Sequence, residues 1–131
     1  EIVNNKGHNH SVDWWAIGVL IFELATGYSP FWAEEPVDMY RLILAGQIEW
    51  PADKQMSHEC SDIITRLLNV NPSKRLGCDR RGHKAVRQHA FYGKMNWEKL
   101  ERKELPPPHK PKIGGPLDTA NFEGIDAREA K

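Results

Sequence analysis

The longest apolar stretch of the chain covers residues 14–25, where only Gly18 and Glu23 interrupt the apolar side chains. A helix that is apolar on every side lies inside a core or spans a membrane. A membrane span needs about 18 or more such residues, so this stretch is too short. We therefore predict a buried core helix that begins near Ser11, a favourable start residue, and ends at Gly27, a favourable stop.

Weaker patterns predict the remaining helices. Pro36 suits the first turn of a helix, and Gly46 suits the position just after its end. Ser57 can cap a further helix, in which the apolar residues recur on one face. The expected helices after the first one cover residues 36–46, 58–70, 84–91 and 96–102. No convincing strand pattern is present, so the predicted fold class is mostly α.

The composition changes at Leu105, where a proline-rich segment begins. Proline lacks a backbone N–H, so this segment suits neither a helix interior nor a central strand. We predict an extended tail that lies on a surface or leads to another element. The sequence thus divides into residues 1–104, which are mainly helical, and residues 105–131, which form the tail.

Bulk properties add few constraints. The chain has 131 residues, enough for one domain, and a formal net charge of +0, so nothing in its overall charge favours nucleic acid or an anionic membrane. The two cysteines favour reduced thiols in an intracellular, cytoplasmic protein. The sequence predicts no signal peptide and no membrane span. Because the chain starts at Glu1 without a methionine, we expect a fragment or a processed piece.

Candidate chemistry is sparse. His8 and His10 lack the three or four converging ligands of a metal site, and no CxxC or HExxH pattern occurs, so no metal is predicted. The basic residues 80–87 have no interleaved aromatics and favour a solvated face over nucleic-acid binding. The PxxP pattern at 108–111 fits either a ligand for another module or a docked tail. No phosphate-binding glycine loop or nucleophile with a partnered base is present.

Two acidic residues of the first helix remain open to two interpretations. Asp13 can be a helix-start acid favoured by the helix dipole, an effect of about 0.3–1 kcal/mol. Glu23 can be the single polar rim position of a mostly buried helix. Alternatively, each acid has a specific role, and the pattern alone does not decide.

Several motifs occur in an order that identifies a family. Asp13, Trp15 and Gly18 match a D-x-W-x-x-G signature, and the turn GYSPF follows at residues 27–31. The segment NPSKRLG at residues 71–77, the stretches His89–Phe91 and Asn96–Trp97, and the tail at 107–122 follow in the same order. The chain resembles the C-terminal half of the helical large lobe of a eukaryotic Ser/Thr protein kinase of the AGC group, followed by part of the AGC tail. It is similar to cyclic-AMP-dependent protein kinase and to protein kinase C.

The resemblance implies roles for particular residues. The F-helix aspartate, here Asp13, would accept hydrogen bonds from the catalytic loop, supported by Trp15 and Gly18. Glu1 and Arg75 would form a buried ion pair that anchors the activation segment. The resemblance assigns Glu23, Tyr28 and Phe31 to the substrate side, with Glu23 meeting a substrate arginine, and it places Phe122 near the adenine of ATP.

The resemblance also places the catalytic residues and the ATP and Mg²⁺ ligands before Glu1. We therefore expect this chain alone to be inactive and to bind neither ATP nor Mg²⁺. The full-length protein would use Mg-ATP to phosphorylate proteins with basic residues near Ser or Thr, and a regulatory subunit or domain is a further expected partner. The alternative is a non-catalytic interaction module or a truncated, pseudokinase-like product.

Overall fold

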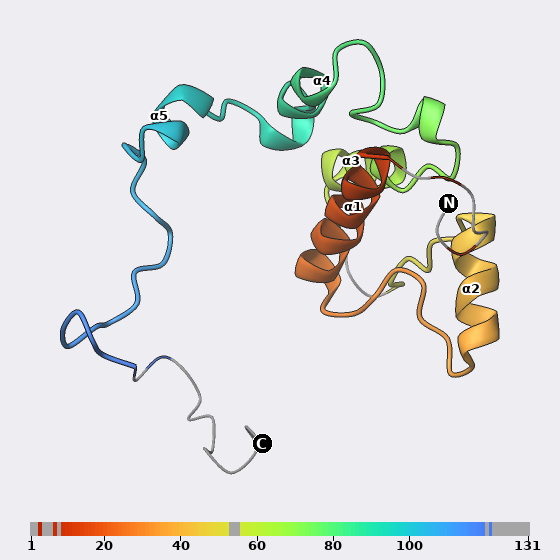
Figure 1. The fold of residues 1–131 in the computed structure, drawn as a ribbon, viewed down its shortest axis with the longest axis horizontal. Helices are drawn as coiled ribbons and strands as arrows, with labels where there is room; N and C mark the ends of the chain where they lie inside the picture. The colour runs from red at the N-terminus through yellow and green to blue at the C-terminus, as the bar shows by residue number, and fades with distance from the viewer. Residues whose placement is uncertain (1–2, 4–6, 8, 53–55, 120, 122–131) are drawn as a thin grey trace. The chain divides into compact units, whose positions relative to one another are not determined.

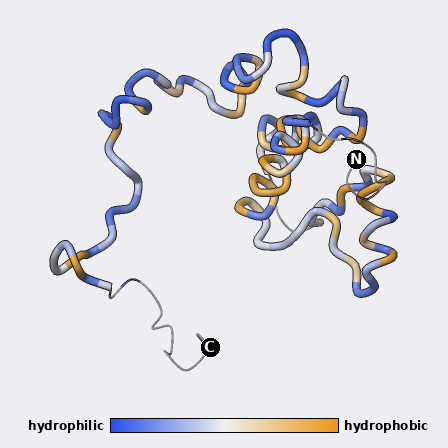
Figure 2. Tube along the Cα trace, in the orientation of Figure 1, coloured by the Kyte–Doolittle hydropathy of each residue, from blue (hydrophilic) through white to orange (hydrophobic). Residues whose placement is uncertain are grey.

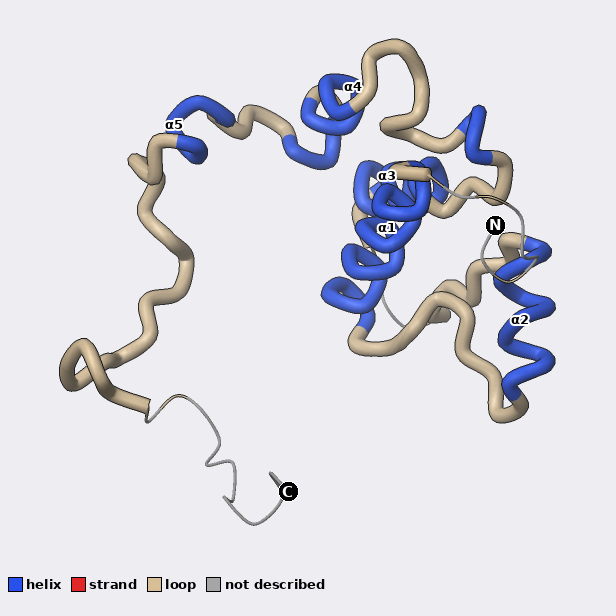
Figure 3. Tube along the Cα trace, in the orientation of Figure 1, coloured by secondary structure: helices blue, strands red, loops and turns tan. Residues whose placement is uncertain are grey.

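The computed structural model describes residues 3, 7, 9–52, 56–119 and 121. Helices and loops make up this part of the chain, without a strand, which confirms the mostly α fold class (Figure 3). The structure divides the chain into two units, Glu1–Met95 and Asn96–Lys131. The first unit contains α1 (Ser11–Thr26), α2 (Pro36–Ala45), α3 (His58–Leu67), η1 (Pro72–Lys74), α4 (His83–Arg87) and η2 (Ala90–Tyr92), and the second contains α5 (Trp97–Glu101) (Figure 1).

The predicted stops of the first two helices are confirmed. Gly27 follows α1 with a φ of 89°, and Gly46 follows α2 with a φ of 64°; both lie in the left-handed region that glycine adopts without strain. The start of α3 is also confirmed, because the Ser57 hydroxyl accepts the Cys60 N–H at 3.2 Å. α1 begins at Ser11 as predicted; its N-cap residue, His10, makes no side-chain cap bond, and the Asn9 side-chain oxygen accepts the Ser11 N–H at 2.9 Å.

Two predicted helices are shorter than expected, because side chains take over backbone hydrogen bonds. α3 ends at Leu67 rather than residue 70, and the Asn69 side chain then accepts the Asn71 N–H at 2.9 Å. The segment 84–91 divides into α4 and η2, where the His89 ring accepts the Phe91 N–H at 3.2 Å. Such hydrogen bonds from polar side chains to nearby backbone N–H groups commonly compete with the backbone hydrogen bonds of a helix.

The core of the first unit lies between α1 and α3, which run side by side (Figure 1). Phe22 of α1 packs with Ile63, Ile64 and Leu67 of α3, and all of these are fully buried. The cluster also contains Leu68 and Phe31, which comes from the loop after α1; each is 3% exposed. The loop after α1 therefore belongs to the interior as much as the helices do.

α1 is not buried on every side, so this prediction is wrong for the described chain. Leu20 is 53% exposed and Leu24 is 79% exposed, although Figure 2 shows hydrophobic colour along most of α1. The side that carries Gly18 and Phe22 is buried against α3. Other side chains of α1, such as Trp15, are partly covered, and full burial would need neighbours all round the helix.

Residues 105–119 form neither helix nor strand, in keeping with their prolines. A short turn is closed where Asp118 accepts the Gly114 N–H at 2.5 Å and where the Asn121 amide donates to the Lys112 carbonyl at 2.9 Å. The assignment of residues 105–131 to a kinase tail, and the boundary after residue 104, stay predictions. No helix in the described part of the chain is long and apolar enough to cross a membrane.

Candidate functional site

Arg75 connects the segment after η1 to the start of α1. Its side chain is 2% exposed, its Nε donates to the Asn69 carbonyl at 2.9 Å, and its Nη1 donates to the Ser11 carbonyl at 2.8 Å. The guanidinium carbon lies 5.1 Å from the centre of the Trp15 ring, a cation–π distance. The predicted partner Glu1 lies outside the described residues, so the ion pair between Glu1 and Arg75 stays a prediction.

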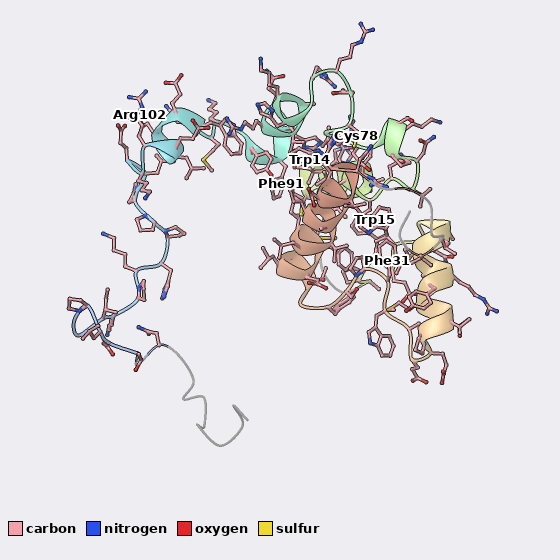
Figure 4. All side chains as sticks on the ribbon, in the orientation of Figure 1. Trp14, Trp15, Phe31, Cys78, Phe91 and Arg102 are labelled. Carbon is pink, nitrogen blue, oxygen red and sulfur yellow. The ribbon has the colours of Figure 1, made fainter. Side chains whose placement is uncertain are left out.

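Trp15 also contacts Phe31, and both side chains lie between α1 and α2 (Figure 4). The two rings are nearly parallel, with 10° between their planes and 5.4 Å between their centres. Such stacked pairs contribute about 0.5–1.5 kcal/mol beyond the area that they bury. Trp15 is therefore in contact with both Arg75 and the turn that follows α1.

The turn over residues 27–32 presents aromatic side chains to solvent. Tyr28 is 40% exposed and Trp32 is 60% exposed, whereas Phe31 between them is buried. Phe31 was expected on the substrate side together with Tyr28, but its ring packs inward against Trp15. Sequence reasoning passed over Trp32, although this large aromatic residue directly follows the motif turn.

The two acids of α1 are both exposed, at opposite ends of the helix. Asp13 lies in the first turn, where a negative charge is favoured by the helix dipole. Glu23 lies near the end, and its backbone carbonyl accepts the Gly27 N–H at 2.7 Å. Within the described part of the chain no ion pair joins Glu23 to a cation, so its carboxylate is available to an external partner.

Gly18 lies where α1 meets the end of α3. A methyl group at this position would come within 2.9 Å of the Leu67 Cβ and within 2.9 Å of the Leu68 Cδ2. Contacts between carbon atoms are favourable at about 3.5–4.0 Å, so only a glycine allows this approach. Gly18 therefore permits the close approach of α1 and α3, and its predicted support of the catalytic loop stays a prediction.

A polar cluster that the sequence did not reveal joins α3 to η2. Asp62 accepts from the Arg66 Nε at 2.9 Å, and its other oxygen lies 3.0 Å from the His89 Nε2. The hydrogen bond from Arg66 lowers the pKa of Asp62 below its ordinary value of 3.8, and His89 contributes in the same direction. The spacing of Asp62 and Arg66 is that of a helical pair and could have been predicted. His89 is distant in sequence and carried no such signal.

Among the described residues, no group of three or more His, Cys, Asp or Glu side chains lies close enough together to hold a metal ion. The absence of ATP and Mg²⁺ binding by this chain alone stays a prediction. Phe122, which the resemblance places near adenine, lies outside the described residues. The described side chains provide a set of contacts from Arg75 through Trp15 to Phe31 in the turn, and a backbone hydrogen bond joins Gly27 of the turn to Glu23.

The class of protein follows from comparison with known families. Residues 1–91 match the protein kinase domain, which is more than half of the chain, and the chain therefore belongs to the protein kinase family. Kinases of this family use ATP and Mg²⁺ and act on protein substrates.

Relatives of this chain include AGC-group Ser/Thr kinases. The human cAMP-dependent protein kinase catalytic subunit PRKX is 41% identical over 94% of this chain and 34% of its own length. The Drosophila melanogaster cAMP-dependent protein kinase catalytic subunit 3 is 40% identical over 100% of this chain and 22% of its own. The chicken ribosomal protein S6 kinase 2 alpha is 40% identical over 94% of this chain and 16% of its own length. These findings confirm the family, and the chain spans about a third or less of each relative.

Proposed function

We propose that this chain is the substrate-side part of a basophilic Ser/Thr kinase. The full-length protein would transfer the γ-phosphoryl group of Mg-ATP to Ser or Thr in proteins that carry arginine nearby. The family membership of residues 1–91 supports the reaction class. The observation that supports the preference for arginine is Glu23, an exposed carboxylate without an ion pair in the described part of the chain.

Glu23 is suited to bind a substrate cation because of its surroundings. The residues before and after it in α1 are apolar, and α1 itself contains no lysine or arginine that could pair with the carboxylate. The hydrogen bond from Gly27 to the Glu23 carbonyl fixes the helix end beside the turn that bears Tyr28. An arginine of the substrate would form a charge-assisted pair with Glu23 while its chain passes the aromatic surface of the turn.

The test is Glu23→Gln in the full-length protein, assayed with two peptides. One has arginine two residues before the phosphoacceptor, and the other has alanine there. We expect kcat/KM for the arginine peptide to fall about 10- to 150-fold, the equivalent of a lost charge-assisted hydrogen bond, with little change for the alanine peptide. Glu34→Gln, which removes another exposed carboxylate, is the matched control and should leave both values unchanged. An equal fall for both peptides would assign Glu23 a structural role.

The other residues of α1 would support the catalytic loop of the full-length protein. Asp13 is exposed at the start of α1, where it can accept backbone N–H groups of a further segment, and Gly18 sets the distance between α1 and α3. We propose ATP and Mg²⁺ as cofactors of the full-length protein and assign neither to the described residues. An intracellular location remains part of the same proposal.

A second candidate function is a non-catalytic interaction module. It is favoured by α2, which contains no buried residue and exposes Val37 at 60%, Tyr40 at 45% and Leu44 at 43%. Such an apolar helix face suits a regulatory subunit or domain. The coding sequence upstream of Glu1 discriminates between the candidates. A catalytic-loop aspartate and an Asp-Phe-Gly motif there support the kinase, and an unrelated sequence supports the module.

A further inference from the structure

The turn over residues 27–32 is fixed from the interior while its aromatic surface faces solvent. The Thr26 hydroxyl lies 2.8 Å from the Phe22 carbonyl and 3.0 Å from the Tyr28 carbonyl. Further along, Pro30 is fully buried, and its carbonyl accepts the Glu49 N–H at 3.2 Å. The position of Tyr28 relative to the end of α1 is thus determined by contacts beneath the turn.

A further contact beneath the turn is the stacked pair of Phe31 and Trp15. Phe31 is the only large side chain that the turn directs into the core cluster among the described residues, and its nearly parallel ring contact needs a flat partner. Trp15 provides that flat surface from the second turn of α1. An aliphatic residue at either position would keep an apolar contact. It would lose the parallel ring geometry that sets the distance of the turn from α1.

Trp15 is itself held in place by Arg75. The guanidinium group lies over the Trp15 ring, and its nitrogens are bound to the Ser11 and Asn69 carbonyls. Because one carbonyl belongs to the first residue of α1 and the other follows the end of α3, the cation is held at both points. A continuous set of contacts therefore runs from Arg75 through Trp15 and Phe31 to the surface of the turn.

We propose that Trp15 and Phe31 are positioning residues for the peptide substrate, and that Arg75 acts on the same turn through the Trp15 ring. This inference rests on the proposed function, since it takes the turn and Glu23 as the peptide-binding surface. Phe31 then acts from beneath the surface rather than by touching the peptide. A displacement of the turn changes the distance between Tyr28 and Glu23, and small displacements of a binding surface have large effects on reaction rates.

The test measures peptide and ATP kinetics of the full-length protein with Trp15→Leu, Phe31→Leu and Trp15→Phe. We expect KM for the arginine peptide to rise about 3- to 10-fold in the two leucine variants, the factor that corresponds to a lost aromatic pair. KM for ATP should stay unchanged, and Trp15→Phe should restore the peptide KM because it keeps a flat ring. Phe31→Leu retains an apolar side chain of similar shape and decides the question alone if Trp15→Leu does not fold.

Leu67→Ala is the control for a general loss of stability. Leu67 is fully buried in the same core cluster but contributes nothing to the stacked pair. If Leu67→Ala raised the peptide KM as much as Phe31→Leu does, the positioning role would be overturned. The double variant Trp15→Leu/Phe31→Leu should have a peptide KM no higher than the larger single effect, because one contact is lost in all three. Multiplicative effects would also overturn the inference.

Two outcomes distinguish a failure of this inference from a failure of the proposed function on which it rests. An unaltered full-length protein that phosphorylates neither peptide would overturn the proposed function and this inference together. An active protein whose leucine variants keep the normal peptide KM would overturn the inference and leave the proposed function intact.

Discussion

Replacing Gly18 by alanine should destabilise the full-length protein, although alanine is the better helix former. The added methyl group would lie 2.9 Å from the Leu67 Cβ, 2.9 Å from the Leu68 Cδ2 and 3.0 Å from the Leu68 Cγ. The Leu68 side chain can rotate away, but the Leu67 Cβ is attached to the backbone of α3, so the two helices must separate. Overpacking of this kind costs about 1–3 kcal/mol. The helix propensity of alanine over glycine offsets about 1 kcal/mol of that cost.

The backbone-fixed contact places the cost in the upper half of that range, so we expect a net loss of about 1–2 kcal/mol in the free energy of unfolding. Urea unfolding followed by tryptophan fluorescence measures this value. Ala16→Gly, on the exposed side of the same helix, is the matched control and measures the propensity effect alone, with an expected loss of about 1 kcal/mol. If Gly18→Ala instead stabilised the protein by the amount that Ala16→Gly removes, the close approach of α1 and α3 would be refuted.

Two further predictions concern acid stability and self-association. Because the folded pKa of Asp62 is lowered, its stabilising contribution is present above the ordinary pKa of 3.8 and is lost as the pH falls through the lower folded value. Asp62→Asn should therefore flatten the loss of stability below about pH 4 in urea titrations of the full-length protein, and identical slopes would contradict this. The isolated chain should self-associate through the exposed Leu20 and Leu24 of α1, and Leu20→Glu/Leu24→Glu should reduce this in ultracentrifugation. A strictly monomeric sample with a cooperative calorimetric transition would refute the second prediction.

Local sequence was sufficient for the helices and for several of their ends. Gly27 and Gly46 end helices, and Ser57 begins one, where these residue types predicted it, because caps and left-handed stops depend on residues within one turn. The order of the motifs, from Asp13 to the segment at 71–77, was also enough to identify the kinase family. These features are properties of neighbouring residues or of their order, which a sequence displays directly.

The tertiary structure decided which side chains are exposed and which residues meet across the chain. The apolar pattern of α1 predicted burial on every side, but α3 covers only one side and leaves Leu20 and Leu24 accessible. The motif turn suggested that Phe31 faces a substrate, yet the ring stacks inward on Trp15. The contacts of Arg75 with Ser11 and of Asp62 with His89 join distant residues. Burial and long-range contact depend on how the elements pack, and a hydrophobic pattern records only that a side chain is apolar, not which neighbour covers it.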